Sequence, residues 1–97
     1  MSSLHVFTVD AGHPAFAGHF PGHPIAPGVL LLQHVAAALR AIAGERMTGV
    51  QEAKFIQPLL PGESASVALT GGEGRWKFTV ARGNDVLVRG SITGSRA

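Results

Sequence analysis

The sequence predicts an α+β domain in which an antiparallel sheet wraps around one buried helix. Three observations lead to this prediction. A short run of β-branched and aromatic residues comes first, a long apolar helical run follows a segment rich in Gly and Pro, and four strand-like runs fill the second half. The order of one strand, one helix and four further strands is typical of an α+β domain with a central helix.

Length and composition fit one domain spanning residues 1–97. Apolar residues make up 45% of the 97 residues and charged residues only 14%, which favours a packed core over disorder. A chain of this size buries a modest share of its surface when it folds alone. We therefore expect an oligomer, at least a dimer, that covers an apolar face.

The first strand is predicted at residues 4–9, LHVFTV, because β-branched and aromatic types dominate there. Eight Gly and Pro residues between Asp10 and Gly28 exclude a long helix or a central strand. This segment is expected to be a single shaped loop, with Asp10 as a turn former.

The central helix is predicted from Val29 to Ala43. Pro27 and Gly28 open it, and Gly44 stands where helices favour a left-handed stop. Its apolar residues surround the axis, so we expect it to be buried on most sides.

Four further strands are expected after this helix, in a meander-like antiparallel sheet. The runs are separated by turn-forming residues and lie at 47–56, 63–71, 75–83 and 86–94. Trp76 alternates with Arg75 and Lys77, which predicts a tryptophan in the core beside two solvated charges.

Several classes of protein receive no support from the sequence. The net charge of +2 is scattered and lacks the basic, aromatic stripe of a nucleic-acid-binding surface. No apolar run is long enough to cross a membrane and no signal peptide is evident, so we expect a cytoplasmic protein. Cysteine is absent and a Phe-Pro-Gly turn separates His19 from His23, so no metal site is predicted.

His19 and the start of the helix are the candidate chemical groups. Gly18 and Gly22 allow close backbone approach around His19, and Pro21 stiffens the loop. The alternative is a structural histidine that hydrogen-bonds to its own loop. The free amides at Gly28 could stabilise negative charge on a carbonyl oxygen, and a base beside such donors indicates removal of an α-proton.

Two stretches together resemble one family. FAGHFPGHPIAPGVLLLQ at 16–33 is similar to the signature of the hot-dog-fold 3-hydroxyacyl-[acyl-carrier-protein] dehydratases, the FabA- and FabZ-like enzymes. KFIQPLLPGE at 54–63 is similar to the strand and turn that follow the central helix in that family. The resemblance covers most of the chain, with both motifs in the same order.

The resemblance implies a sheet of five or six strands around a central helix, and dimers with two active sites at the interface. It also implies a substrate carried on the phosphopantetheine of an acyl carrier protein, with no other cofactor. His19 matches the catalytic histidine, and Gly28 matches the amide that polarises the thioester carbonyl. Phe20, Pro21 and Val29 match residues that shape the substrate site beside them.

Gln33 departs from the family pattern, which places a carboxylate at this helix position. An amide cannot donate a proton to a departing hydroxyl, and general acid help is worth about 10²- to 10⁴-fold. Three hypotheses follow. His19 performs both proton transfers while Gln33 orients the hydroxyl, or the chain is a silent partner of a paralogous dehydratase subunit, or the chemistry has changed to thioester hydrolysis or acyl binding.

No other residue is an evident replacement for the missing acid. His34 is turned by about 100° from Gln33 around the helix, and Glu45 and Glu52 lie beyond the helix. We interpret three histidines as surface or interface residues: His5, His13 and His34.

The function favoured by the sequence is dehydration of a (3R)-hydroxyacyl carrier-protein thioester to the trans-2-enoyl thioester. It would serve fatty-acid or polyene/polyketide-type biosynthesis, and in size the chain resembles the small dehydratases of aryl-polyene pathways. The expected partners are an acyl carrier protein and a second chain, in a homodimer or a heterodimer. Positive charge around Arg75, Lys77 and Arg82 is expected to help dock the acidic carrier.

Overall fold

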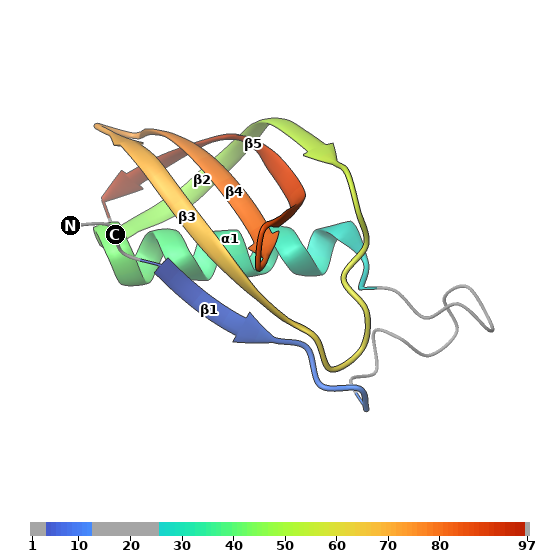
Figure 1. The fold of residues 1–97 in the computed structure, drawn as a ribbon. Coiled ribbons are helices and arrows are strands. Elements are labelled where there is room, and N and C mark those ends of the chain that lie inside the picture. Colours follow the sequence, from blue (N-terminus) through green and yellow to red (C-terminus); the bar gives the residue numbers. More distant parts are fainter. Residues whose placement is uncertain (1–3, 13–25, 97) are drawn as a thin grey trace.

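The computed structural model describes residues 4–12 and 26–96, and the fold consists of five strands and one helix in this part of the chain (Figure 1). Their bounds follow the predicted segments closely. In chain order they are β1 (Leu4–Thr8), α1 (Gly28–Ala43), β2 (Glu45–Phe55), β3 (Ser64–Gly72), β4 (Arg75–Arg82) and β5 (Asp85–Arg96).

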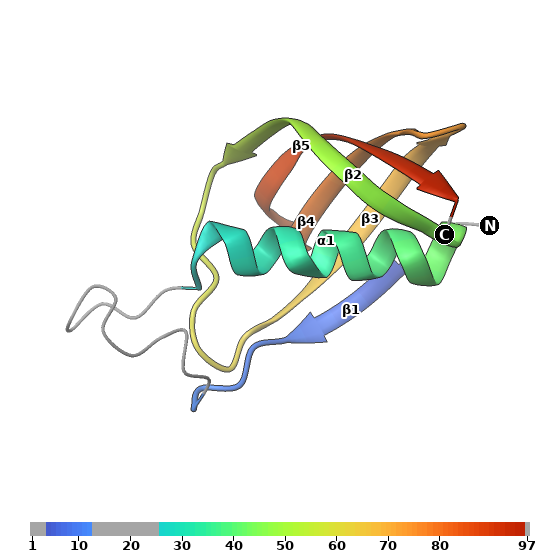
Figure 2. The same ribbon diagram turned by 180° about the vertical axis from the view of Figure 1, so that it is seen from behind.

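The five strands form one antiparallel sheet in the order β1-β3-β4-β5-β2. Helix α1 runs along one face of this sheet, with the two edge strands β1 and β2 on either side of it (Figures 1 and 2). The sheet curves around the helix, which confirms the predicted α+β architecture with an antiparallel sheet around one central helix.

The predicted meander is correct for β3, β4 and β5 but wrong for β2. A full meander would pair β2 with β3, whereas β2 pairs with β5 at the opposite edge of the sheet. The reason is the connection at residues 56–63, which leaves β2 near the start of α1 and passes that end of the helix before β3 begins (Figure 1). This connection brings the second sequence motif to the start of the helix.

The ends of α1 are set by the residues that the sequence predicts. Pro27 has extended backbone angles, φ −60° and ψ 146°, and immediately precedes the helix. Gly44 adopts the left-handed conformation at φ 68° and ψ 22°, and its N–H donates to the carbonyl of Arg40 at 3.0 Å. A glycine adopts this conformation without steric cost, so the helix ends at Ala43.

The core lies between one face of α1 and the concave face of the sheet. Leu31, Val35 and Leu39 on the helix are almost completely buried, as is Phe78 on β4. Trp76 packs against this core and its Nε1 donates to Glu45 Oε1 at 3.0 Å, while Arg75 and Lys77 are exposed. The predicted alternation along β4 is confirmed.

The prediction that α1 is buried on most sides is wrong for the single chain. Three residues spaced four apart on the helix are exposed: Val29, Gln33 and Ala37. The exposed fraction of Val29 is 66%. One sheet can cover only one side of a helix, so this stripe faces away from it. An apolar helix face without cover is the feature that a second chain would bury.

We expect Phe78→Ala to lower the free energy of unfolding by about 3 to 5 kcal/mol, because it empties a fully packed site in the core. Thr79→Ala on the opposite face of the same strand is the matched control and should cost less than about 1 kcal/mol. Urea denaturation of both variants measures the difference. Equal losses would show that the concave face of β4 is not the core.

Candidate functional site

The start of α1 presents backbone donors that no described residue satisfies. The carbonyl of Pro27 accepts the amides of Leu30 and Leu31 at 3.0 and 3.4 Å. The amides of Gly28 and Val29 have no hydrogen-bond partner among residues 4–12 and 26–96. These donors lie at the positive end of the helix dipole, so the position suits an oxygen on which negative charge develops.

Phe55 packs against the first residue of the helix, Gly28. A Cβ atom on Gly28 would lie 2.8 Å from Cε1 and Cζ of the Phe55 ring. The aromatic ring at the end of β2 therefore lies directly on the first residue of the helix, and 51% of its surface is exposed. Phe55 was not predicted from the sequence as a site residue, although it lies in the KFIQPLLPGE motif.

The connection between β2 and β3 holds both flanks of the segment that contains His19. The amide of Ala26 donates to the carbonyl of Leu59 at 2.9 Å, and the amide of Gly62 donates to the carbonyl of Val9 at 2.8 Å. Val9 precedes residues 13–25 and Ala26 follows them. The two sequence motifs are therefore joined by backbone hydrogen bonds.

Several predicted site residues lie outside the part of the chain that the structure describes. They are His19, Phe20 and Pro21, and His13 lies outside it as well. Their proposed roles stay predictions, as does the interpretation of His13 as a surface or interface residue.

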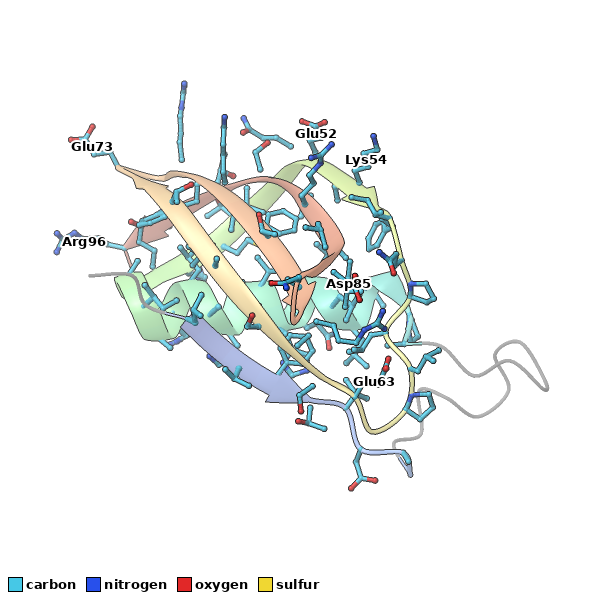
Figure 3. All side chains as sticks on the ribbon, in the orientation of Figure 1. Glu52, Lys54, Glu63, Glu73, Asp85 and Arg96 are labelled. Carbon is cyan, nitrogen blue, oxygen red and sulfur yellow. The ribbon has the colours of Figure 1, made fainter. Side chains whose placement is uncertain are left out.

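Gln33 lies on the exposed stripe of α1, one helical turn beyond Val29. The two carboxylates considered as substitutes lie elsewhere. Glu45 accepts the hydrogen bond from Trp76 just beyond the C-terminal end of the helix, and Glu52 points away from the helix on the outer side of the sheet (Figure 3). Neither supplies an acid beside Gln33.

His34 does not lie freely on the surface. Its ring stacks on Phe7 of β1, with 3.9 Å between centroids and 6° between planes, so it helps join α1 to the sheet. His5 is half-buried on β1. Asp10 forms the predicted turn, since its Oδ1 accepts the amide of Gly12 at 2.7 Å.

The described residues hold neither a cluster of metal ligands nor a membrane-spanning helix. No group of three or more potential metal ligands comes together in residues 4–12 and 26–96. Helix α1 is the helix found in the described residues, and it is too short to cross a membrane.

The positively charged residues divide into two groups. Arg82 is engaged within the protein, with its Nη1 at 2.9 Å from Glu63 Oε1, and its part in docking the carrier stays a prediction. The other seven Lys and Arg residues make no ion pair with the described residues. Among these seven are Lys54 on β2, Arg75 and Lys77 on β4, and Arg89 on β5.

These four cations share the outer face of the sheet, opposite α1. Thr79 pairs with Arg89 between the rows of the buried Phe78 and Val80. Lys77 pairs with Ser91 in the row between Trp76 and Phe78. Lys54, drawn in Figure 3 with its side chain away from the helix, lies directly opposite Arg89 on the neighbouring strand.

Comparison with known proteins agrees with the fold and the motifs. The family model of ApeI-like proteins, described as ApeI dehydratase, matches residues 2–91. The 3-hydroxyacyl-[acyl-carrier-protein] dehydratase FabZ of Chlamydia trachomatis is 36% identical over 101 residues, which cover 88% of this chain and 66% of that protein. The chain therefore spans slightly less than two thirds of this relative.

Solved structures show the same arrangement of strands and helix. The dehydratase heterocomplex ApeI:P from Xenorhabdus doucetiae is similar with a TM-score of 0.82 at 23% identity, covering 98% of this chain and 88% of the other. The fluoroacetyl-CoA thioesterase FlK is similar with a TM-score of 0.65 at 16% identity, covering 98% of this chain and 84% of that one.

The fold and the two motifs thus define a hot-dog-fold protein of the 3-hydroxyacyl-[acyl-carrier-protein] dehydratase class. Within that class the chain belongs to the ApeI-like dehydratase family.

Gly28→Ala should change the free energy of unfolding by less than about 1 kcal/mol, since the new methyl group meets the far end of an exposed ring and alanine favours the helix. Gly90→Ala is the matched comparison and should cost about 3 kcal/mol, because its Cβ would overlap the backbone carbonyl of Glu52. Urea denaturation compares the two, and NMR shifts of the Phe55 ring report its displacement. An equal loss in both variants would mean that the ring of Phe55 is fixed.

Proposed function

We propose that the protein takes part in dehydration of a (3R)-hydroxyacyl thioester, carried by an acyl carrier protein, to the trans-2-enoyl thioester. The observation that carries the proposal is the pair of amides at Gly28 and Val29 that no described residue satisfies, in a chain whose family has dehydratase members. A cytoplasmic location and an aryl-polyene-type pathway stay predictions.

The proposed reaction needs one base and one oxyanion donor. His19 takes the α-proton, and the electron pair moves toward the thioester carbonyl, whose oxygen accepts a hydrogen bond from Gly28. The pair then forms the double bond as the C–O bond to the 3-hydroxyl breaks. The imidazolium of His19 returns its proton to the leaving hydroxyl, which departs as water, while the Gln33 amide orients that group.

A second chain is proposed to cover the open stripe of α1. The stripe carries Val29 and Gln33, two of the proposed site residues, and an exposed apolar helix face favours a partner. The similar ApeI:P protein is a heterocomplex. The replacement of the expected acid by Gln33 supports a second candidate function, that of a catalytically silent subunit paired with a paralogous dehydratase.

The outer face of the sheet is proposed to dock the acidic carrier protein. Lys54, Arg75, Lys77 and Arg89 share this face with the carboxylate of Glu52 (Figure 3), so positive charge predominates among these residues. Lys54 lies directly opposite Arg89, and like charges in this position repel each other. An acidic partner would relieve that repulsion and would be attracted over a longer range.

The decisive test compares wild type with Gln33→Glu, assayed with a 3-hydroxyacyl carrier-protein substrate, alone and mixed with paralogous subunits. If the acid is the missing group, Gln33→Glu raises turnover by about ten-fold or more, because glutamic acid can donate the proton. His19→Ala is the inactive control.

Each outcome separates the candidates. A fast wild type that Gln33→Glu slows identifies an enzyme in which His19 acts alone. Turnover only in the mixture identifies the silent subunit. Carrier binding with no dehydration in any mixture would reject dehydration in favour of acyl binding, and release of free acid would indicate thioester hydrolysis.

Carrier binding should weaken by at least about ten-fold in the double variant Lys77→Glu/Arg89→Glu at low salt, and wild-type affinity should fall as salt screens the charges. Arg96→Glu is the control, since Arg96 is exposed at one end of the molecule (Figure 3). Isothermal titration with an acylated carrier measures both effects. Affinity that is constant from low to physiological salt would contradict the docking model.

A further inference from the structure

We propose that Arg82 is a positioning residue, which fixes both flanks of the His19 segment by clamping the connection at residues 57–63. The inference rests on the proposed function, because it assigns Arg82 to the same site. None of the contacts that Arg82 makes with the described residues involves the start of α1.

The Arg82 guanidinium converges on three residues of this connection. Its Nη1 donates to Glu63 Oε1 at 2.9 Å and to the carbonyl of Pro58 at 3.2 Å, and its Nη2 donates to Gln57 Oε1 at 3.4 Å. Asp85 Oδ2 adds an ion-pair contact with Nη2 at 3.6 Å. A planar group with five donors in a fixed fork can bind several separate acceptors in fixed directions, whereas a lysine has three donors on one nitrogen.

Glu63 and the backbone make the connection a closed unit. Glu63 Oε1 also accepts the amide of Leu60 at 2.8 Å, so one carboxylate oxygen joins Arg82 to the turn. The amides of Ile56 and Gln57 both donate to the carbonyl of Leu87, at 2.7 and 3.2 Å. Figure 3 shows Glu63 and Asp85 at the end of the molecule where α1 begins.

The clamped connection reaches the site through two backbone hydrogen bonds. Leu59, which is completely buried, accepts the amide of Ala26 two residues before Gly28. Gly62 donates to the carbonyl of Val9 on the other flank of residues 13–25. Arg82 is therefore linked, through one connection, to a residue just before the helix start and to both described flanks of residues 13–25.

The contribution of Arg82 is expected to be local. Its side chain is 27% exposed and that of Glu63 is 32% exposed, and ion pairs with this much solvent contact contribute little to the stability of the whole fold. Misplacing reactive groups by a fraction of an ångström can, by contrast, reduce turnover strongly.

The test measures amide hydrogen exchange and turnover in Arg82→Met. Exchange at the amides of Ala26 and Gly62 should accelerate by at least about ten-fold, while amides of the β3–β4 ladder keep their wild-type rates. In whichever assembly is active, kcat should fall by about ten-fold or more with little change in KM. Arg96→Met, which removes an exposed charge at the other end of the molecule, should change neither quantity.

Two graded variants keep the proposal falsifiable if Arg82→Met folds poorly. Arg82→Lys retains the charge but not the fork, and Glu63→Gln retains the acceptor but not its charge, so both should give intermediate exchange rates at Ala26 and Gly62. Exchange at these two amides that equals wild type, or that rises uniformly across the sheet, overturns the proposal. So does faster local exchange with an unchanged kcat.

Failure of the proposed function is recognised separately. If the wild type and its mixtures never dehydrate a carrier-bound substrate, the assignment to that reaction falls. The exchange measurements still decide whether Arg82 holds the two flanks of the His19 segment.

Discussion

The packing of one face of α1 into the curved sheet is the interaction on which the rest of the structure depends. Leu31, Val35 and Leu39 bury their side chains against the strands, and the sheet can close on the helix only if β1 and β2 occupy opposite edges. That requirement sends residues 56–63 past the first turn of the helix. The second motif therefore lies beside the first as a consequence of how the helix packs in the sheet.

The same packing leaves the chain with two unlike surfaces. The open stripe of α1 holds Val29 and Gln33 and favours contact with another chain, whereas the outer sheet face holds cations that make no ion pair with any described residue. Docking and chemistry would then take place on opposite sides of one sheet. If the carrier docks on the outer face as proposed, its phosphopantetheine arm would have to pass around an edge of the sheet to reach the start of α1. The arm could use only an edge near the docked carrier.

Much of the fold follows from the sequence, because local signals define it. Pro27 and Gly44 mark the ends of the helix, alternation along β4 separates Trp76 from its charged neighbours, and Asp10 forms its turn. Strand order could not be predicted in the same way, since the pairing of β2 with β5 joins segments far apart in the sequence, and no local pattern encodes it. The family motif predicts Gly28 as a site residue, but only the structure shows that Phe55 rests on it and that Arg82 is engaged.

Strand β2 contains two extra residues relative to β5. Thr48 stands between the pairs Met47–Gly94 and Gly49–Thr93, and Gln51 between Val50–Ile92 and Glu52–Ser91. A β-bulge places two residues of one strand opposite one of its partner. Loss of either residue would leave every remaining pair in register, so these two positions allow the length of a strand to vary in evolution without disturbing the face that packs on the helix.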